Sequence, residues 1–349
     1  MKEQYKVGRQ LGLAAAAVTS AAAFVATVPA VASAGTAPSA VVVDGVLTIR
    51  GTHADNAVVL DDGDPTFLTV DFEDGRAPRS FERSGVRAVA VYLGAGDDRF
   101  RTLRDGATPL PLTIAAGPGD DRVVGGAGAD TIWGGFGRDT LLGGGGNDVV
   151  SGGSGADFVD GGVGTDTEAL GSGDDTAAWV PGEGSDVVDG QSGRDTLAFD
   201  GANADEQMSL APDGRHAVLL RTQGNIRMDL DSVERVQVNA LGGADTVTVD
   251  GLDGTDVRQA VVDLGGNGGG DARTDAVIVN GSDRADHVAV TARSGAVVVA
   301  GLTATTTITG SEPTDRLDLR TLGGFDRVEV APDVAALIGL TLDLGTGQV

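Results

Sequence analysis

The chain has 349 residues, a formal net charge of −26, 56 glycines and no cysteine. The absence of cysteine excludes disulfide cross-links and thiol chemistry. The strong negative charge argues against nucleic acid and anionic membranes as partners and favours the binding of cations.

The first 34 residues have the order of features that is typical of a secretory signal peptide. Lys2, Lys6 and Arg9 form a basic start, and the alanine-rich apolar run that follows ends at an A-x-A cleavage site at residues 32–34. A membrane anchor is the alternative, but the run is mostly alanine and is interrupted by threonine and serine. The sequence therefore predicts a secreted, extracellular protein, and no later stretch is long and apolar enough to span a bilayer.

A nine-residue unit recurs between residues 116 and 198. With Gly125 as position one, the units are AGPGDDRVV, GGAGADTIW, GGFGRDTLL, GGGGNDVVS, GGSGADFVD, GGVGTDTEA and LGSGDDTAA, and, after the inserted Trp179 and Val180, PGEGSDVVD and GQSGRDTLA. Position four is glycine in all nine units, and position eight is apolar in every unit except one, where it is Glu168. Position six is always aspartate: Asp121, Asp130, Asp139, Asp148, Asp157, Asp166, Asp175, Asp186 and Asp195.

This pattern predicts short strands that are joined by glycine turns. Glycines at positions one, two and four let the backbone adopt positive φ and turn its carbonyl groups to one side, and the aspartate adds a carboxylate to the same turn. The apolar residue at position eight starts a very short strand with one inward side chain. Two units then form one coil of a parallel solenoid, in which the turns of units i and i+2 stack about 4.8 Å apart.

The stacked carboxylates require a counter-charge. Bare carboxylates at this spacing repel by about 1 kcal/mol per pair in water, and by more when they are partly desolvated. A divalent cation between successive turns would reverse the sign of that interaction. Carboxylate and carbonyl oxygens without histidine or cysteine favour Ca²⁺ over Zn²⁺ or Cu²⁺. The repeat therefore predicts a folding unit that binds several Ca²⁺ ions and is disordered without them.

These units resemble the RTX, or haemolysin-type, calcium-binding nonapeptide GGxGxDxUx over residues 116 to 198. The resemblance implies a parallel β-roll with Ca²⁺ between turns on the same side, held by the position-six aspartates and by carbonyl groups of the glycine turns. The glycines implied as ligands are Gly126, Gly128, Gly135, Gly137, Gly144, Gly146, Gly153 and Gly155. The same-side pairs that match the family best are Asp121 with Asp139, Asp130 with Asp148, Asp139 with Asp157, and Asp148 with Asp166.

The chain departs from the family pattern in its later units. Glu168 replaces an inward aliphatic residue, Ala177 is small, and the inserted Trp179-Val180 lengthens one coil. These changes put calcium binding by Asp175 and Asp186 in question.

Three flanking segments share a second, longer plan. GTHADNAVVL begins at Gly51, GANADEQMSL at Gly201 and GSDRADHVAV at Gly281, and short Val/Leu-rich strands and glycine loops follow each of them. These strands predict an all-β chain, namely one continuous parallel β-solenoid with the β-roll in its middle; separate β-sandwich domains are the alternative. The predicted parts are a signal peptide at 1–34, β modules at 35–115, 201–280 and 281–349, and the β-roll at 116–200.

Candidate sites outside the repeat are few. Asp98, Asp245 and Asp326 lie in similar glycine loops and are candidate further Ca²⁺ ligands. The chain has no H-E-x-x-H zinc helix, G-x-S-x-G elbow, P-loop or dinucleotide fingerprint. The sequence therefore predicts a non-catalytic structural or interaction role, with an extracellular or cell-surface partner of unknown identity. A polysaccharide lyase or epimerase on a β-helix, which needs no fixed motif, and an extracellular adhesin are the alternatives.

Overall fold

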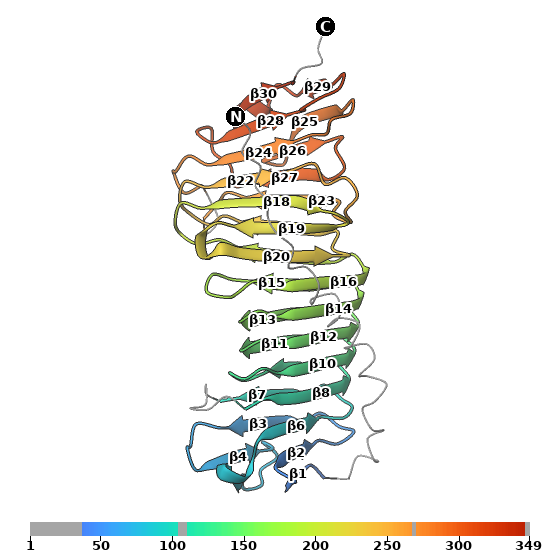
Figure 1. Ribbon diagram of the computed structural model, residues 1–349, viewed down its shortest axis with the longest axis vertical. Coiled ribbons are helices and arrows are strands. Elements are labelled where there is room, and N and C mark those ends of the chain that lie inside the picture. The colour runs from blue at the N-terminus through green and yellow to red at the C-terminus, as the bar shows by residue number, and fades with distance from the viewer. Residues whose placement is uncertain (1–36, 104–109, 267–269, 346–349) are drawn as a thin grey trace, which may run out of the picture.

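A computed structural model describes residues 37–103, 110–266 and 270–345 of the chain. These residues form one long stack of strands, with β1 near one end and β30 at the other (Figure 1). Within this described part, the strands belong to two sheets of 15 strands each. The predicted all-β solenoid is confirmed.

The N-terminal part consists of short strands and one 3₁₀ helix. They are β1 (Ser39–Val43), β2 (Val46–Arg50), β3 (Ala57–Asp61), β4 (Phe67–Asp71), β5 (Arg79–Glu82), η2 (Arg83–Gly85), β6 (Ala88–Tyr92) and β7 (Arg99–Thr102). In β2, β4 and β6 the buried residues alternate with exposed or half-buried ones, and in β2 Leu47 and Ile49 are fully buried.

The roll follows as ten strands of three to seven residues. They are β8 (Leu112–Pro118), β9 (Arg122–Val124), β10 (Thr131–Phe136), β11 (Thr140–Gly145), β12 (Val149–Ser154), β13 (Phe158–Val163), β14 (Thr167–Gly173), β15 (Thr176–Trp179), β16 (Val187–Gly193) and β17 (Thr196–Asp200). Even-numbered strands pair in parallel in one sheet and odd-numbered strands in the other. Ile132 pairs with Val150 and Leu141 pairs with Val159, so one coil contains two nonapeptides, as predicted.

The C-terminal part continues both sheets. Its elements are β18 (Gln207–Asp213), β19 (His216–Arg221), η3 (Gln223–Asn225), β20 (Ile226–Asp231), β21 (Arg235–Asn239), β22 (Thr246–Val249), β23 (Gln259–Asp263), β24 (Ala276–Asn280), β25 (His287–Arg293), β26 (Ala296–Ala300), β27 (Thr305–Thr309), β28 (Arg316–Arg320), β29 (Arg327–Val330), η4 (Val334–Ala336) and β30 (Gly339–Asp343). β20 pairs in parallel with β16, and β21 pairs in parallel with β17, so the roll passes into this part without a break in hydrogen bonding.

Each of the three related flanking segments begins an antiparallel meander, which the sequence analysis did not predict. The meanders are β3–β4–β5, β18–β19–β20 and β25–β26–β27. Consecutive antiparallel strands of such a meander can be joined by a tight hairpin turn. Ser294 and Gly295, between β25 and β26, both have positive φ, as a two-residue type I′ turn requires. The solenoid is therefore parallel along its stack, with antiparallel excursions in the flanks.

The core of the roll is built mainly from the position-eight side chains. All nine position-eight side chains are at most 2% exposed, which confirms their predicted inward direction. They are Val123, Ile132, Leu141, Val150, Val159, Glu168, Ala177, Val188 and Leu197. Each coil of the roll therefore buries only two such side chains.

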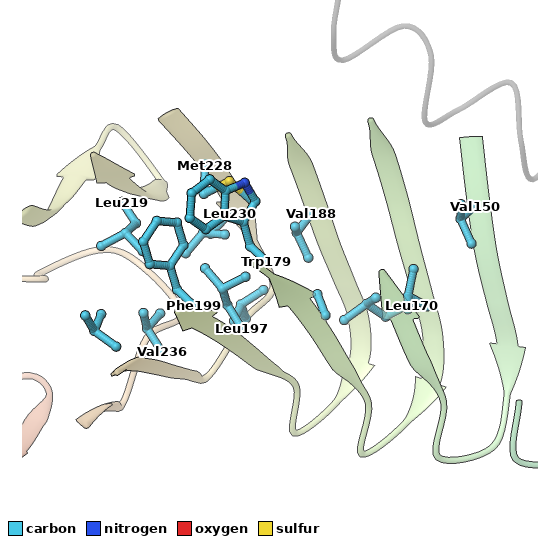
Figure 2. Close-up of a cluster of buried hydrophobic side chains, with 14 of the residues drawn as sticks. Val150, Leu170, Trp179, Val188, Leu197, Phe199, Leu219, Met228, Leu230 and Val236 are labelled. Carbon is cyan, nitrogen blue, oxygen red and sulfur yellow. The ribbon is translucent and has the colours of Figure 1, made fainter. Parts of the chain in front are cut away.

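The inserted Trp179 lies where the narrow roll meets the wider C-terminal coils. Its ring stacks on Phe199 with centroids 4.2 Å apart and planes 3° apart, and the two residues pair across β15 and β17 (Figure 2). Its indole N–H donates a hydrogen bond to the Gly184 carbonyl oxygen at 2.8 Å. The residue that interrupts the repeat thus gives its strand a second inward side chain and widens the core.

Candidate metal centre: two columns of buried aspartates

The nine position-six aspartates lie directly before the strands of the roll, and the fold divides them into two columns. All nine are buried, with at most 3% exposure. The first column precedes the odd-numbered strands and consists of Asp121, Asp139, Asp157, Asp175 and Asp195. The second column precedes the even-numbered strands and consists of Asp130, Asp148, Asp166 and Asp186. All four same-side pairs expected from the sequence are therefore neighbours within a column.

One carboxylate oxygen of each aspartate binds the neighbouring coil. The backbone N–H of Asp121 donates to Oδ1 of Asp139 at 2.8 Å, and the N–H of Asp130 donates to Oδ1 of Asp148 at 2.7 Å. The same bond recurs along both columns, including Asp166 to Asp186 at 2.7 Å and Asp175 to Asp195 at 2.9 Å. The insertion at Trp179 therefore leaves the ladder continuous, and Asp175 and Asp186 keep their places in it.

The second oxygen of most of these aspartates is buried and has no hydrogen-bond partner. This holds for Oδ2 of Asp121, Asp139, Asp148, Asp157, Asp166, Asp175 and Asp195. In contrast, Oδ2 of Asp130 accepts the N–H of Gly126 at 2.7 Å. A buried unpartnered carboxylate oxygen is costly, because it has lost its hydration without replacement. Rows of such oxygens fit a hard cation such as Ca²⁺, which takes several oxygen ligands in flexible geometry.

The position-one glycines are required by space rather than by backbone conformation. Gly125, Gly143 and Gly152 do not have positive φ, which corrects the expectation for this position. A Cβ on Gly125 would lie 2.8 Å from Oδ2 of Asp130, and one on Gly152 would lie 2.7 Å from Oδ2 of Asp157. In the units that begin with glycine, the carboxylate therefore occupies the space that a side chain at position one would fill.

The glycines whose carbonyl groups are implied as ligands all lie where one coil contacts the next. Of these eight, Gly126 and Gly128 lack the positive φ that was expected, whereas the other six have it. All eight carbonyl oxygens face along the stack toward the glycine one coil later, as Gly135 O does toward Gly153 and Gly137 O toward Gly155. Coordination of an ion by these oxygens and by the nine aspartates stays a prediction.

Burial changes the acidity of the columns. Desolvation raises the pKa of Asp139 and of Asp148 to about 7, although a backbone N–H that donates to each carboxylate lowers it in part. The pKa of Asp157 rises to about 6 for the same reason, and the charge of Asp175 adds to the rise. Without a cation, the aspartates of the folded roll therefore retain their protons to a higher pH than aspartates in the unfolded chain do.

The ladder extends beyond the repeats. The N–H of Asp98 donates to Oδ1 of Asp121 at 2.7 Å, and Oδ2 of Asp98 is another buried oxygen without a partner. At the other end of this column, the N–H of Asp195 donates to Oε2 of Glu234 at 2.8 Å. Sequence reasoning named Asp98 but missed Glu234. The signal that could have identified Glu234 is its place directly before a strand, β21.

A further column lies in the C-terminal part. It joins Glu206, Asp245, Asp275 and Asp315 through N–H to carboxylate bonds of 2.8–3.0 Å. Asp286 and Asp326 form a shorter ladder of the same kind, with a bond of 2.9 Å. Asp245 and Asp326 were expected here, whereas the other four members were not.

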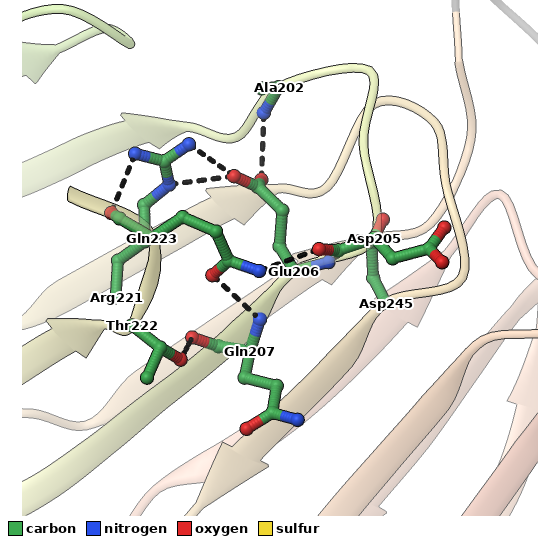
Figure 3. A network of polar contacts seen from close by, with 8 residues as sticks. All are labelled: Ala202, Asp205, Glu206, Gln207, Arg221, Thr222, Gln223 and Asp245. Carbon is green, nitrogen blue, oxygen red and sulfur yellow. Dashed lines mark hydrogen bonds and ion pairs between the residues drawn. The ribbon is translucent and has the colours of Figure 1, made fainter. Parts of the chain in front are cut away.

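Some flanking carboxylates have donors from the chain itself. Both oxygens of Glu206 are engaged, because Nε of Arg221 donates to Oε1 at 2.7 Å and the N–H of Ala202 donates to Oε2 at 2.7 Å (Figure 3). Likewise, Oδ2 of Asp315 accepts the N–H of Glu312 at 2.7 Å, and Oδ2 of Asp286 accepts the N–H of Ser282 at 2.8 Å. These flanking carboxylates thus have hydrogen-bond donors for their second oxygen, which most aspartates of the roll lack.

The family comparison matches the same coils. The model of the RTX calcium-binding nonapeptide repeat matches in four copies, at residues 113–141, 133–168, 142–177 and 182–203. The central coils are RTX calcium-binding nonapeptide repeats. The RTX matches leave out residues 178–181, where Trp179 and Val180 are inserted. A comparison with curated proteins gives no match.

The RTX repeats supply one carboxylate per turn rather than a cluster. In the described residues, no group of three or more Asp, Glu or His side chains is arranged to hold a metal ion by itself. RTX repeats are calcium-binding units, and their Asp Oδ2 atoms and glycine carbonyls are the oxygen donors that such an ion prefers.

Proposed function

We propose that the protein is a secreted Ca²⁺-binding protein whose RTX roll closes when Ca²⁺ binds, and that its role is structural or interactive rather than catalytic. The single observation that carries this proposal is the row of buried Oδ2 atoms without partners, from Asp121 to Asp195. These oxygens belong to RTX repeats, for which calcium binding is the family property.

The small amount of apolar surface that each coil buries supports a coupling between ion binding and folding. Each coil of the roll buries two position-eight side chains, whose transfer from water contributes only about 1.5–3 kcal/mol each. This gain is opposed by the conformational entropy that the 18 residues of each coil lose and by the desolvation of two carboxylates. Bound Ca²⁺ supplies the positive charge that these carboxylates lack. We therefore expect the roll to be open at low Ca²⁺ and closed at millimolar Ca²⁺, by mass action.

Secretion is part of the proposal and is supported by the sequence of residues 1–34, which lie outside the described residues. No helix in the described part is long and apolar enough to cross a membrane. Removal of residues 2–34 should keep the protein inside a bacterial host, whereas the full chain should be found outside the cytoplasm. The low cytoplasmic Ca²⁺ would leave the roll open before export.

A polysaccharide-acting enzyme is not favoured by the lining of a surface hollow in the C-terminal part. This hollow of about 600 Å³ is lined by residues that include Asp250, Asp253, Asn280 and Arg284. The described residues around it include one arginine and no aromatic side chain on which a sugar ring could stack. Incubation with uronate polysaccharides should therefore yield no new unsaturated or epimerised product.

Calorimetric titration of the purified chain with Ca²⁺, and with Mg²⁺ as a control, tests the proposed ion binding. We expect several Ca²⁺ ions to bind with dissociation constants of about 0.1–1 mM, and Mg²⁺ to bind far more weakly. Absence of Ca²⁺ uptake at millimolar concentration would overturn the proposal.

A further inference from the structure

Glu168 interrupts the apolar core of the roll. It occupies position eight, and in the sheet it lies between Val150 and Val188, with which it pairs in register. Its side chain is as buried as theirs, at 2% exposure. An unpaired carboxylate in a core is expensive, and buried charges in proteins are generally paired or bound to a metal.

The contacts of Glu168 leave half of its carboxylate without a partner. Oε1 accepts the N–H of Gly161 at 2.8 Å, which fixes the direction of the group. Oε2 is buried and has no hydrogen-bond partner. Within the described residues, no arginine or histidine forms an ion pair with Glu168.

The carboxylate of Glu168 lies beside that of Asp166, on the inner side of one glycine turn. A Cβ placed on Gly161 would be 2.6 Å from Oδ2 of Asp166 and 2.8 Å from Oε1 of Glu168. Oδ2 of Asp166 is itself buried and without a partner. Asp186 follows Asp166 in the second column, and its negative charge acts on Glu168. The carboxylates of Asp166 and Glu168 therefore lie together at this turn, whereas the turn at Gly152 has that of Asp157 alone.

The loop that contains the insertion adds further negative charge to this region. Glu183, two residues after Pro181, has Oε2 fixed by the N–H of Val180 at 2.8 Å. The charges of Asp160, Asp186 and Asp166 all act on Glu183. Glu183, in the inserted loop, thus adds a negative charge that interacts with Asp166.

We propose that Glu168 is an additional Ca²⁺ ligand beside Asp166 and that the tightest Ca²⁺ site of the roll lies at this turn. The inference rests on the proposed function, since it requires the roll to bind Ca²⁺. Each extra anionic ligand raises the affinity of an oxygen site for Ca²⁺. The replacement of an aliphatic residue by glutamate is then a gain of a ligand rather than a defect in the core.

The test uses Glu168→Gln in the full chain, with Asp139→Asn as a matched control. The glutamine keeps the size of the side chain and can still accept the N–H of Gly161, but it has no charge. Calorimetric titration with Ca²⁺ should show that Glu168→Gln loses the tightest site, with affinity reduced on the order of tenfold or more. Asp139→Asn should weaken a different site and leave the tightest one intact.

A second measurement distinguishes a ligand from a buried acid that is simply protonated. The rise in Tm between chelator and saturating Ca²⁺ should be smaller for Glu168→Gln than for the unsubstituted chain. An unchanged isotherm and an unchanged rise in Tm, in a chain that does bind Ca²⁺, would overturn the assignment of Glu168 alone. If the unsubstituted chain binds no Ca²⁺, the assignment and the proposed function both fail.

Discussion

The backbone N–H of Asp139 donates to Oδ1 of Asp157, one coil later, at 2.8 Å. Each such bond uses one oxygen of a carboxylate to fix the spacing of two coils, and in seven of the nine aspartates the other oxygen, Oδ2, is buried without a partner. The ladder therefore positions the aspartates without neutralising them. The predictions below follow from the different contacts of Oδ1 and Oδ2.

Replacement of a ladder aspartate should weaken both calcium binding and the calcium-dependent part of stability. Asp148→Asn keeps an oxygen for the N–H of Asp130 but removes the charge. We expect a loss of about 1–3 kcal/mol of unfolding free energy in saturating Ca²⁺, measured by denaturant unfolding. Asp120→Asn is the matched control, because Asp120 is exposed and accepts only the N–H of Arg138. Equal effects of the two substitutions would contradict the assigned role of Oδ2.

Gly143, at position one of its unit, should not tolerate even a methyl group. A Cβ on Gly143 would meet the Gly161 carbonyl oxygen and would lie 2.5 Å from Oδ2 of Asp148. Gly143→Ala is therefore expected to cost about 1–3 kcal/mol in unfolding free energy. Gly145→Ala is the control, because its Cβ would have only Ala127 Cα nearby, at 3.7 Å. A neutral Gly143→Ala would show that the coils can move apart at no cost.

Without Ca²⁺, the roll should be most stable at acidic pH. Burial raises the pKa of Asp139 and Asp148 from 3.8 to about 7, so the folded state binds protons more tightly than the unfolded chain does. Stability from these groups is then complete below about pH 3.8 and is lost as the pH rises toward 7. Circular dichroism of the chelated protein should show β signal decreasing over this range. Loss of signal on acidification instead would contradict the raised pKa values.

The C-terminal part should stay folded when Ca²⁺ is removed. Hydrogen exchange in chelator should show protection at residues 207–231, where Arg221 neutralises Glu206, and rapid exchange at residues 121–166. Uniform exchange over both regions would show that the calcium-dependent unit is the whole solenoid.

The ion pair of Arg221 with Glu206 provides a charge substitution whose effect on stability should not depend on calcium. Their side chains are 10% and 0% exposed. Arg221→Met leaves a buried carboxylate unpaired and should cost about 3 kcal/mol or more, with or without Ca²⁺. Arg194→Met, at an exposed pair with Asp174, should change the unfolding free energy little. If Ca²⁺ restored the stability of Arg221→Met, the flanking column would also be a metal site.

The roll was predictable from the sequence because its period is fixed. Every coil contact joins residues 18 apart until the insertion, so Asp121 and Asp139 could be paired and Ile132 placed inward from spacing alone. The flanking ladder has no such period. Glu206 and Asp245 are 39 residues apart, whereas Asp245 and Asp275 are 30 apart, because loops and meanders of different length separate them.

Two other features depended on contacts between coils that spacing does not reveal. Glycine at position one looked like a requirement for positive φ, but Gly143 is needed because a neighbouring coil and a carboxylate fill the adjacent space. Trp179 looked like an interruption of the repeat, but it is buried against Phe199 and widens the core at the junction. For Gly143 the reason is the carboxylate of Asp148 and the adjacent coil. For Trp179 it is the ring of Phe199, which is distant in the sequence.

Far-UV circular dichroism of the purified chain during a Ca²⁺ titration, with Mg²⁺ as control, tests the central claim most directly. The unpartnered Oδ2 atoms of the columns predict a steep gain of β signal with Ca²⁺ alone, reversed by chelator, above a constant contribution from the flanks. A spectrum that is already fully β-rich in chelator at neutral pH, and that Ca²⁺ leaves unchanged, would contradict the coupling of calcium binding to folding.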